Sequence, residues 1–254
     1  MNIEPIYEPK EDFVKDPMRI VALFSGGASA VPFMVDGETY EVVGAISSDK
    51  NASGIEKLEN LGISVEVNDI HNFYKSGSVP FYGLEPAPIE DMKIRKHYDT
   101  RNLLIIKDKD WRPDAITCSG YMYFLTDVFL EAYSNRILNV HPADLSILDE
   151  NGDRKYIGDN AVRDAMKNRE EATKSTIHIM NEIVDGGPIL YMSDELPVEG
   201  RNYKEQQELM KDKCDGPAYK KALELLSMGR FFIDGESNVF IKTYGDKDGR
   251  YFGH

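Results

Sequence analysis

Three side chains of this sequence could act together on a carbonyl carbon: an amide, an imidazole and a carboxylate. Asn139 and His141 lie in the segment ILNVH, where an apolar run ends, and Asp185 lies further along in DGGP. Side chains alternate in a strand, so Asn139 and His141 would share one face at its carboxyl end. The amide could donate to an oxygen that gains negative charge, and the imidazole could carry a proton. Taken singly, each also has a structural explanation, as a histidine bonded to backbone or an aspartate in a turn.

Two further segments could bind ligands. Residues 25–30 read SGGASA and offer backbone N–H groups at a predicted helix start, which suits an anion. The same glycines would also suit a tight turn, and neither the P-loop nor the dinucleotide-binding pattern is present. Residues 121–125 read YMYFL, an apolar cluster that suits either a core or a flat aromatic ligand. His178 lies in a half-exposed strand pattern and is predicted to be structural.

The elements that must position these residues alternate between apolar strands and amphipathic helices. This order predicts an α/β fold: a Rossmann-like, mostly parallel sheet flanked by helices. Ligands of such sheets bind beyond the carboxyl ends of the strands, where SGGASA, YMYFL and NVH all fall. The predicted strands are residues 19–24, 41–48, 63–67, 114–119 and the run that ends at 141, and the predicted helices are 53–61, 91–107 and 126–133.

The second half of the chain has a different pattern. Residues 175–180 and 189–192 flank the DGGP turn and predict an antiparallel hairpin. Residues 158–168 predict a helix, and residues 202–229 predict one long helix or a broken pair. We therefore divide the chain into an N-terminal extension (1–18), one domain (19–232) and a C-terminal tail (233–254) that could add an edge strand.

Composition excludes several classes of protein. The net charge of −14 argues against a nucleic-acid binder, because phosphate contacts need a basic face. No apolar stretch reaches membrane-spanning length, and the acidic N-terminus does not resemble a signal peptide, so we expect a cytoplasmic protein without membrane contact. The two cysteines lie far apart, and we expect neither a disulfide framework nor a metal site.

Taken together, the motifs resemble the formyltransferase family. The resemblance rests on N-x-H-P at residues 139–142 and on TIHI followed by DGGPIL at residues 176–190. RIVALFSGGASA, RPDAITCSGYMYFL and AYKKALELLSMGR are similar to other family segments in the same order, so the resemblance covers roughly residues 19–232. The sequence departs from the family pattern in Ala30, which replaces an asparagine, in longer loops near residues 76–90 and 145–157, and in the N-terminal extension.

The resemblance implies transfer of a formyl group from 10-formyltetrahydrofolate to a primary amine, without a metal. In the family pattern Asn139 bonds the formyl oxygen, and His141 stabilises the oxyanion and assists proton transfer. Asp185 fixes the imidazole or relays a proton through water. The expected acceptor is glycinamide ribonucleotide of purine biosynthesis. Alternatives are another amine such as an amino sugar nucleotide, a formyltetrahydrofolate deformylase, or a non-catalytic folate- or nucleotide-binding protein on the same fold.

The resemblance also assigns binding residues. The partners that the resemblance implies are two small molecules, a folate and a phosphorylated amine. A homodimer is also compatible with it. The residues expected to bind the folate are Tyr121, Met122, Phe124, Leu125, Val140 and Val184. The residues expected to bind the acceptor are Ser25, Gly26, Gly27, Ala28, Ser29, Arg101 and Asp215.

Overall fold

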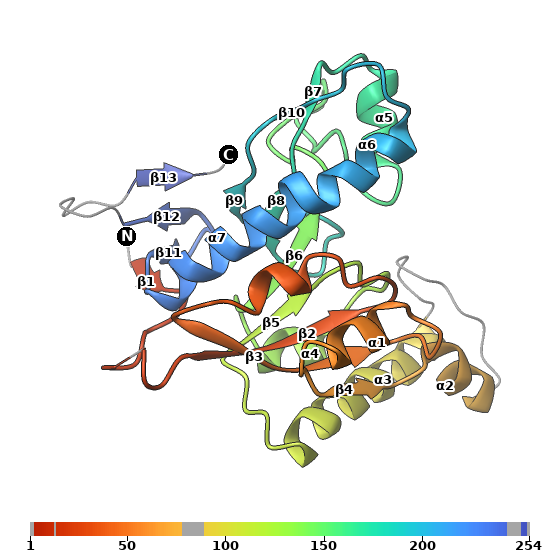
Figure 1. Cartoon of the computed structure of the whole chain (residues 1–254), viewed down its shortest axis with the longest axis vertical. Helices are drawn as coiled ribbons and strands as arrows, with labels where there is room; N and C mark the ends of the chain where they lie inside the picture. The colour runs from red at the N-terminus through yellow and green to blue at the C-terminus, as the bar shows by residue number, and fades with distance from the viewer. Residues whose placement is uncertain (1–2, 13, 78–88, 243–249, 253–254) are drawn as a thin grey trace.

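One seven-stranded sheet organises the molecule. The computed structural model describes residues 3–12, 14–77, 89–242 and 250–252. The strand order is β4-β3-β2-β5-β6-β8-β9, parallel from β4 to β6 and antiparallel at β8 and β9 (Figure 1). The predicted fold class is therefore confirmed, including the hairpin of β8 and β9. The strands are β2 (Met18–Phe24), β3 (Tyr40–Ser47), β4 (Val65–Val67), β5 (Ala115–Cys118), β6 (Ile137–His141), β8 (Thr176–Ile179) and β9 (Ile189–Met192).

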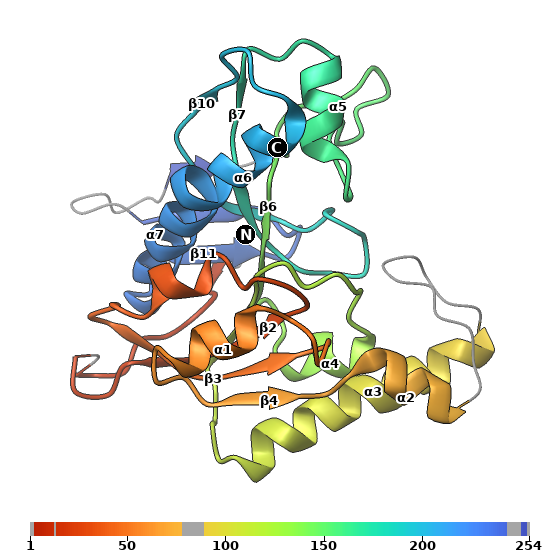
Figure 2. The same cartoon turned by 45° about the vertical axis from the view of Figure 1, so that its right-hand side comes forward.

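Strand β2 is apolar and buried from Ile20 to Phe24 because helices cover both faces of the sheet (Figures 1 and 2). Its alternate residues enter different cores: Val21 and Leu23 pack with α3 and α4, while Ile20 packs with α7. The helices are α1 (Gly54–Glu59), α2 (Ile70–Gly77), α3 (Ile89–Asp108), α4 (Asp127–Ala132), α5 (Ala161–Lys167), α6 (Tyr203–Met210) and α7 (Gly216–Ser227). Among the described residues, none of these helices combines the length and apolar character that a membrane span needs.

Two helical segments differ from the sequence prediction, and a third agrees with it. The helix expected after SGGASA is a single 3-10 turn, η1 (Val31–Met34), because the apolar run VPFMV stops at Asp36 and Gly37. The segment predicted as one helix or a broken pair is α6 and α7 joined by the π-helical turn η2 (Lys211–Asp215). Helix α2 was not predicted, although Ile70, Phe73 and Tyr74 have the spacing of one helix face. Most of the predicted loop at 75–90 lies outside the described residues.

The two ends of the chain meet in a second, antiparallel sheet. Its order is β1-β11-β12-β13, so the N-terminal extension pairs with the segment that follows α7. This sheet closes one side of the domain, away from the carboxyl edge of the large sheet (Figure 1). Its strands are β1 (Ile3–Pro5), β11 (Phe231–Asp234), β12 (Val239–Ile241) and β13 (Arg250–Phe252); the short pair β7 (Ala172–Thr173) and β10 (Leu196–Pro197) lies apart from both sheets.

Candidate active site

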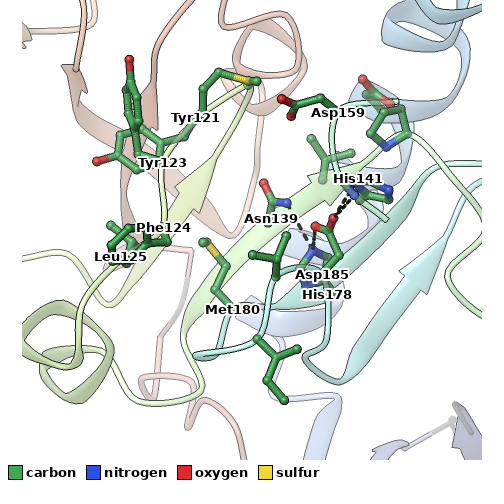
Figure 3. Close-up of a pocket in the computed structure, with 18 of the residues that line it drawn as sticks. Tyr121, Tyr123, Phe124, Leu125, Asn139, His141, Asp159, His178, Met180 and Asp185 are labelled. Carbon is green, nitrogen blue, oxygen red and sulfur yellow. Dashed lines mark hydrogen bonds and ion pairs between the residues drawn. The ribbon is translucent and has the colours of Figure 1, made fainter. Parts of the chain in front are cut away.

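The predicted amide, imidazole and carboxylate converge at the end of β6. Asn139 and His141 leave one face of β6, and antiparallel β8 sets His178 directly opposite Asn139. The turn that follows β8 then brings Asp185 back over both histidines (Figure 3). Segments far apart in the sequence thus supply one compact polar cluster.

Asp185 bridges the two histidines. Its Oδ2 lies 3.3 Å from Nδ1 of His141, and its Oδ1 lies 3.5 Å from Nε2 of His178. The backbone N–H of Gly158 also donates to Oδ2 at 2.8 Å. With a relative exposure of only 9%, the Asp185 carboxylate depends on these partners rather than on water.

The ring of His141 is held on both sides. Its Nε2 lies 2.8 Å from the carbonyl oxygen of Tyr156, which can only accept, so this nitrogen carries a hydrogen. Its Nδ1 faces Asp185. The two acceptors fix the ring plane and favour the imidazolium form, whereas burial opposes it.

His178 fixes the amide of Asn139. Nδ1 of His178 donates to the carbonyl of Ile179 at 3.0 Å, so Nε2 faces the catalytic candidates. Nε2 lies 3.2 Å from Nδ2 of Asn139 and 3.5 Å from Oδ1 of Asp185; without a hydrogen it accepts from the amide, and with a hydrogen it donates to the carboxylate. The second hydrogen and the amide oxygen of Asn139, which is only half-buried, remain for a ligand.

Burial and pairing act in opposite directions on the charges. Burial lowers the pKa of His141, while Asp185, the Tyr156 carbonyl and Asp159 oppose that shift. Burial by itself would raise the pKa of Asp185, but His178, His141 and the N–H of Gly158 together bring it down to about 2. Asp185 is therefore an anion at neutral pH, and it can balance a positive charge that forms on His141.

A cavity of about 230 Å³ opens beside this cluster. All six residues assigned to the folate line it, with Tyr121 to Leu125 on one wall and the segment that precedes Asp185 on another (Figure 3). The three catalytic candidates, Ser29 and Asp215 also line it. The remaining lining residues are Gly120, Tyr123, Pro142, Gly158, Asp159, His178, Met180, Asn181, Glu182, Ile183, Gln207 and Lys211.

Other assigned residues lie outside the lining of this cavity. In the loop of residues 25–28, the N–H groups of Gly26 and Gly27 donate to no other described residue. Ser25 instead joins neighbouring loops, because its Oγ accepts from the backbone N–H of Met122 at 3.0 Å. Arg101 lies exposed on α3, beside Asn102, which bonds Asn68 at the edge of the sheet. The structure therefore does not bring Arg101 to the cavity.

Asp215 is a second perturbed carboxylate in the cavity wall. It ends the π-helical turn η2, and its Oδ1 accepts from the hydroxyl of Ser175 at 2.5 Å. Burial raises its pKa to about 6, although Ser175 and Lys211 lower it in part. A carboxylate with this pKa can change its charge near neutral pH, which is typical of functional sites.

Sequence reasoning missed several residues of the site. His178 was predicted to be structural, yet it contacts both Asn139 and Asp185. The signal that could have found it is the predicted hairpin, since a strand before DGGP that pairs with 137–141 must bring its residues opposite Asn139. Asp159 and Lys211 offer no such signal. Among the described residues, no cluster of His, Cys, Asp and Glu side chains could hold a metal ion.

Comparisons with known proteins agree with this geometry. A family model described as formyl transferase matches residues 18–220. The chain is 27% identical over 178 residues to phosphoribosylglycinamide formyltransferase of Escherichia coli, covering 68% of this chain and 70% of that one. It is 24% identical over 192 residues to the trifunctional purine biosynthetic protein adenosine-3 of Homo sapiens, covering 74% of this chain but only 16% of that protein. Glycinamide ribonucleotide transformylase 1 of Symbiobacterium toebii has a similar structure, with a TM-score of 0.71, 24% identity and coverage of 89% and 94% of the two chains.

Proposed function

Since the chain belongs to the formyl transferase family, we propose that it transfers a formyl group from 10-formyltetrahydrofolate to the primary amine of glycinamide ribonucleotide. The named relatives act in purine biosynthesis, and this supports the choice of acceptor. One observation carries the proposal: Asn139, His141, His178 and Asp185 form a contiguous network beside a cavity. We place the reaction in the cytoplasm.

The network suits attack of an amine on a formyl carbon. When bound, 10-formyltetrahydrofolate supplies that carbon, and its oxygen gains negative charge as the amine adds. Asn139 donates its free amide hydrogen to this oxygen, and His141, paired with Asp185, adds positive charge beside it. The amine nitrogen loses a proton and the departing folate nitrogen gains one, so the imidazole and its carboxylate need only relay protons.

The two substrates would occupy different parts of the cavity. The apolar wall of Tyr121, Phe124 and Leu125, with Val184 opposite, suits the flat folate ring, and Met122 and Val140 extend that surface. Asp215, Lys211 and Ser29 suit the polar acceptor, whose phosphate would bind the free N–H groups of residues 25–29. Arg101 as a second phosphate anchor stays a prediction of the family resemblance, because it lies on the exposed face of α3.

A non-catalytic folate-binding protein is the main rival from another class. Binding alone would need the apolar wall, but it would not need a buried carboxylate held between two histidines. Formyl transfer to another amine, and hydrolysis by water, would use the same network. Substrate choice therefore has to be measured.

The decisive experiment is a turnover assay with 10-formyltetrahydrofolate and a panel of amines that includes glycinamide ribonucleotide. The wild type should release tetrahydrofolate only with its acceptor, and Asn139→Ala should lower kcat by roughly 10²–10³-fold, as expected for loss of one preorganised donor. Asp185→Ala should also lower kcat strongly. Asn168→Ala, which removes an exposed amide at the end of α5, serves as the matched control. Release of tetrahydrofolate without any amine would indicate a deformylase, and its absence with every amine would indicate a binding protein.

A further inference from the structure

The long loop that follows His141 has a defined conformation of its own. Leu148 and Arg154 pair in an antiparallel bridge, and the N–H of Lys155 donates to the carbonyl of Ile147 at 2.9 Å. Between them Asp149 caps the turn, since its Oδ1 accepts from the backbone N–H groups at positions 151 and 153. The loop is thus a small hairpin that sets Arg154 at a fixed place.

Arg154 extends from this hairpin to the DGGP turn that carries Asp185. Its Nη1 donates to the backbone carbonyl of Asp185, and its side chain is half-buried. The next residues of the same segment also contact the network, because the Tyr156 carbonyl accepts from His141 and the Gly158 N–H donates to Asp185. Arg154, Tyr156 and Gly158 therefore hold both members of the His141–Asp185 pair.

Asp185 needs such support because of its backbone conformation. Its φ is +50°, in the left-handed region that residues with a Cβ atom rarely adopt. From this conformation its two carboxylate oxygens face different histidines. The Asp185 carbonyl and the carboxylate are carried by the same residue, so a shift of its backbone would move the carboxylate away from at least one histidine. A donor on that carbonyl opposes the shift.

The guanidinium also adds charge. The titratable groups that face His141 are Asp185, His178 and Asp159, and Arg154 adds a permanent cation on the far side of Asp185. This cation stabilises the ionised form of Asp185 and disfavours a second positive charge nearby. Loss of Arg154 would raise the pKa of Asp185 and also that of His141.

We propose that Arg154 is a positioning residue of the formyl transfer site: it holds the Asp185 carbonyl so that the carboxylate bridges His141 and His178. The inference rests on the proposed function, and it gives the long loop at residues 145–157 a role. Arg154 acts through Asp185, so it should affect the rate of the chemical step more than the binding of either substrate.

Steady-state kinetics and histidine titration together test this role. Arg154→Met should lower kcat roughly 10- to 100-fold, the scale of a small misplacement of a catalytic group, while both KM values change by less than about threefold. The acid limb of its pH profile should move to higher pH, and Arg154→Lys should recover part of the rate. Lys155→Met removes a neighbouring charge that, within the described part of the chain, lies near Glu170 and the Tyr156 ring, and it should behave as wild type.

An NMR titration of the five histidines measures their pKa values and tests the contact between Arg154 and Asp185 without an activity assay. It should show a changed histidine pKa in Arg154→Met and none in Lys155→Met. Unchanged kcat and unchanged titration in Arg154→Met would overturn the proposal; if that variant does not fold, the same two readouts are applied to Arg154→Gln. A wild type that titrates as described but transfers no formyl group would refute the proposed function while leaving the positioning intact.

Discussion

Two turns border the site, and each contains a glycine pair next to a residue with positive φ. In SGGAS the residue is Ala28, with φ of +46°, and in DGGP it is Asp185, with φ of +50°. A Cβ at Gly26 would meet nothing within 4 Å, whereas a Cβ at Gly187 would lie 1.8 Å from the carbonyl oxygen of Ile179. The backbone around Gly26 in the first turn is therefore open, whereas Gly187 in the second turn lets the chain pack closely against β8.

The difference shows what each turn presents to a substrate. SGGAS buries its side chain at Ala28 and leaves the N–H groups of Gly26 and Gly27 without described partners. DGGP bonds its backbone to neighbours, through Arg154 on Asp185 and through the Pro188 carbonyl, and presents a carboxylate instead. Similar local sequences thus leave backbone donors open in one place, where we propose that a phosphate binds, and present an anionic side chain in the other.

The largest expected effect tests the packing of the second turn. Gly187→Ala should lower the free energy of unfolding by about 2–4 kcal/mol, because the backbone of β8 has to move. The shift should also displace Asp185 and abolish most turnover. Gly26→Ala is the matched change in the first turn, and its stability should stay within about 0.5 kcal/mol of wild type. Urea unfolding curves measure the free energy of unfolding of both variants. Equal losses of stability would contradict the proposed difference between the two turns.

A smaller effect should appear in the pH dependence of stability. Asp185 has a pKa of about 2 when folded and 3.8 as the reference value, so the folded protein binds fewer protons at acid pH. Its contribution is complete above pH 5 and should fall by about 1 kcal/mol between pH 5 and 3. Asp185→Asn should lack this loss, as urea unfolding at several pH values can measure.

Asp215, in the same cavity wall, should respond in the opposite direction. Its pKa of about 6 lies above 3.8, so the folded protein binds more protons and gains about 1 kcal/mol between pH 7 and 5. Asp215→Asn should lack that gain. Asp99, buried beneath Thr126, has a similar pKa and the same sign, so Asp99→Asn is the control that separates the two groups. Parallel pH curves for all three variants and the wild type would contradict these assignments.

Much of the fold could be predicted because apolar runs and turn residues act locally. VALF and AITC are short, mainly apolar runs, and they lie in the buried strands β2 and β5. Helix α2 is short, and its helical spacing of Ile70, Phe73 and Tyr74 was overlooked; Ile70 and Tyr74 pack in the same core as the sheet. The π-helical turn at Lys211–Asp215 adds a residue to an otherwise regular helical pattern, and local sequence does not mark it.

The site was predictable only in part, for a different reason. The period of a strand sets Asn139 and His141 on one face, and the hairpin brings Asp185 near them. Contacts made by the loop hairpin depend on its path in space, so neither Arg154 nor the Tyr156 carbonyl carries a sequence signal. Arg101 shows the converse case, since a position aligned by resemblance lies on an exposed helix face.

The smallest expected effect concerns Ala28, where opposing contributions nearly cancel. Ala28→Gly relieves the positive φ, which favours the folded state by up to about 1 kcal/mol. It also removes a methyl group that is 2% exposed and packs in the core with Phe24 and Leu58, at a cost of about 0.8 kcal/mol. The added freedom of glycine in the unfolded chain costs roughly 0.4–1 kcal/mol more. Stability should therefore fall by less than about 2 kcal/mol, and affinity for inorganic phosphate, measured by calorimetry, should stay within about threefold because the backbone donors are unchanged. Loss of phosphate binding in Ala28→Gly would mean that this turn, like DGGP, acts through its side chain.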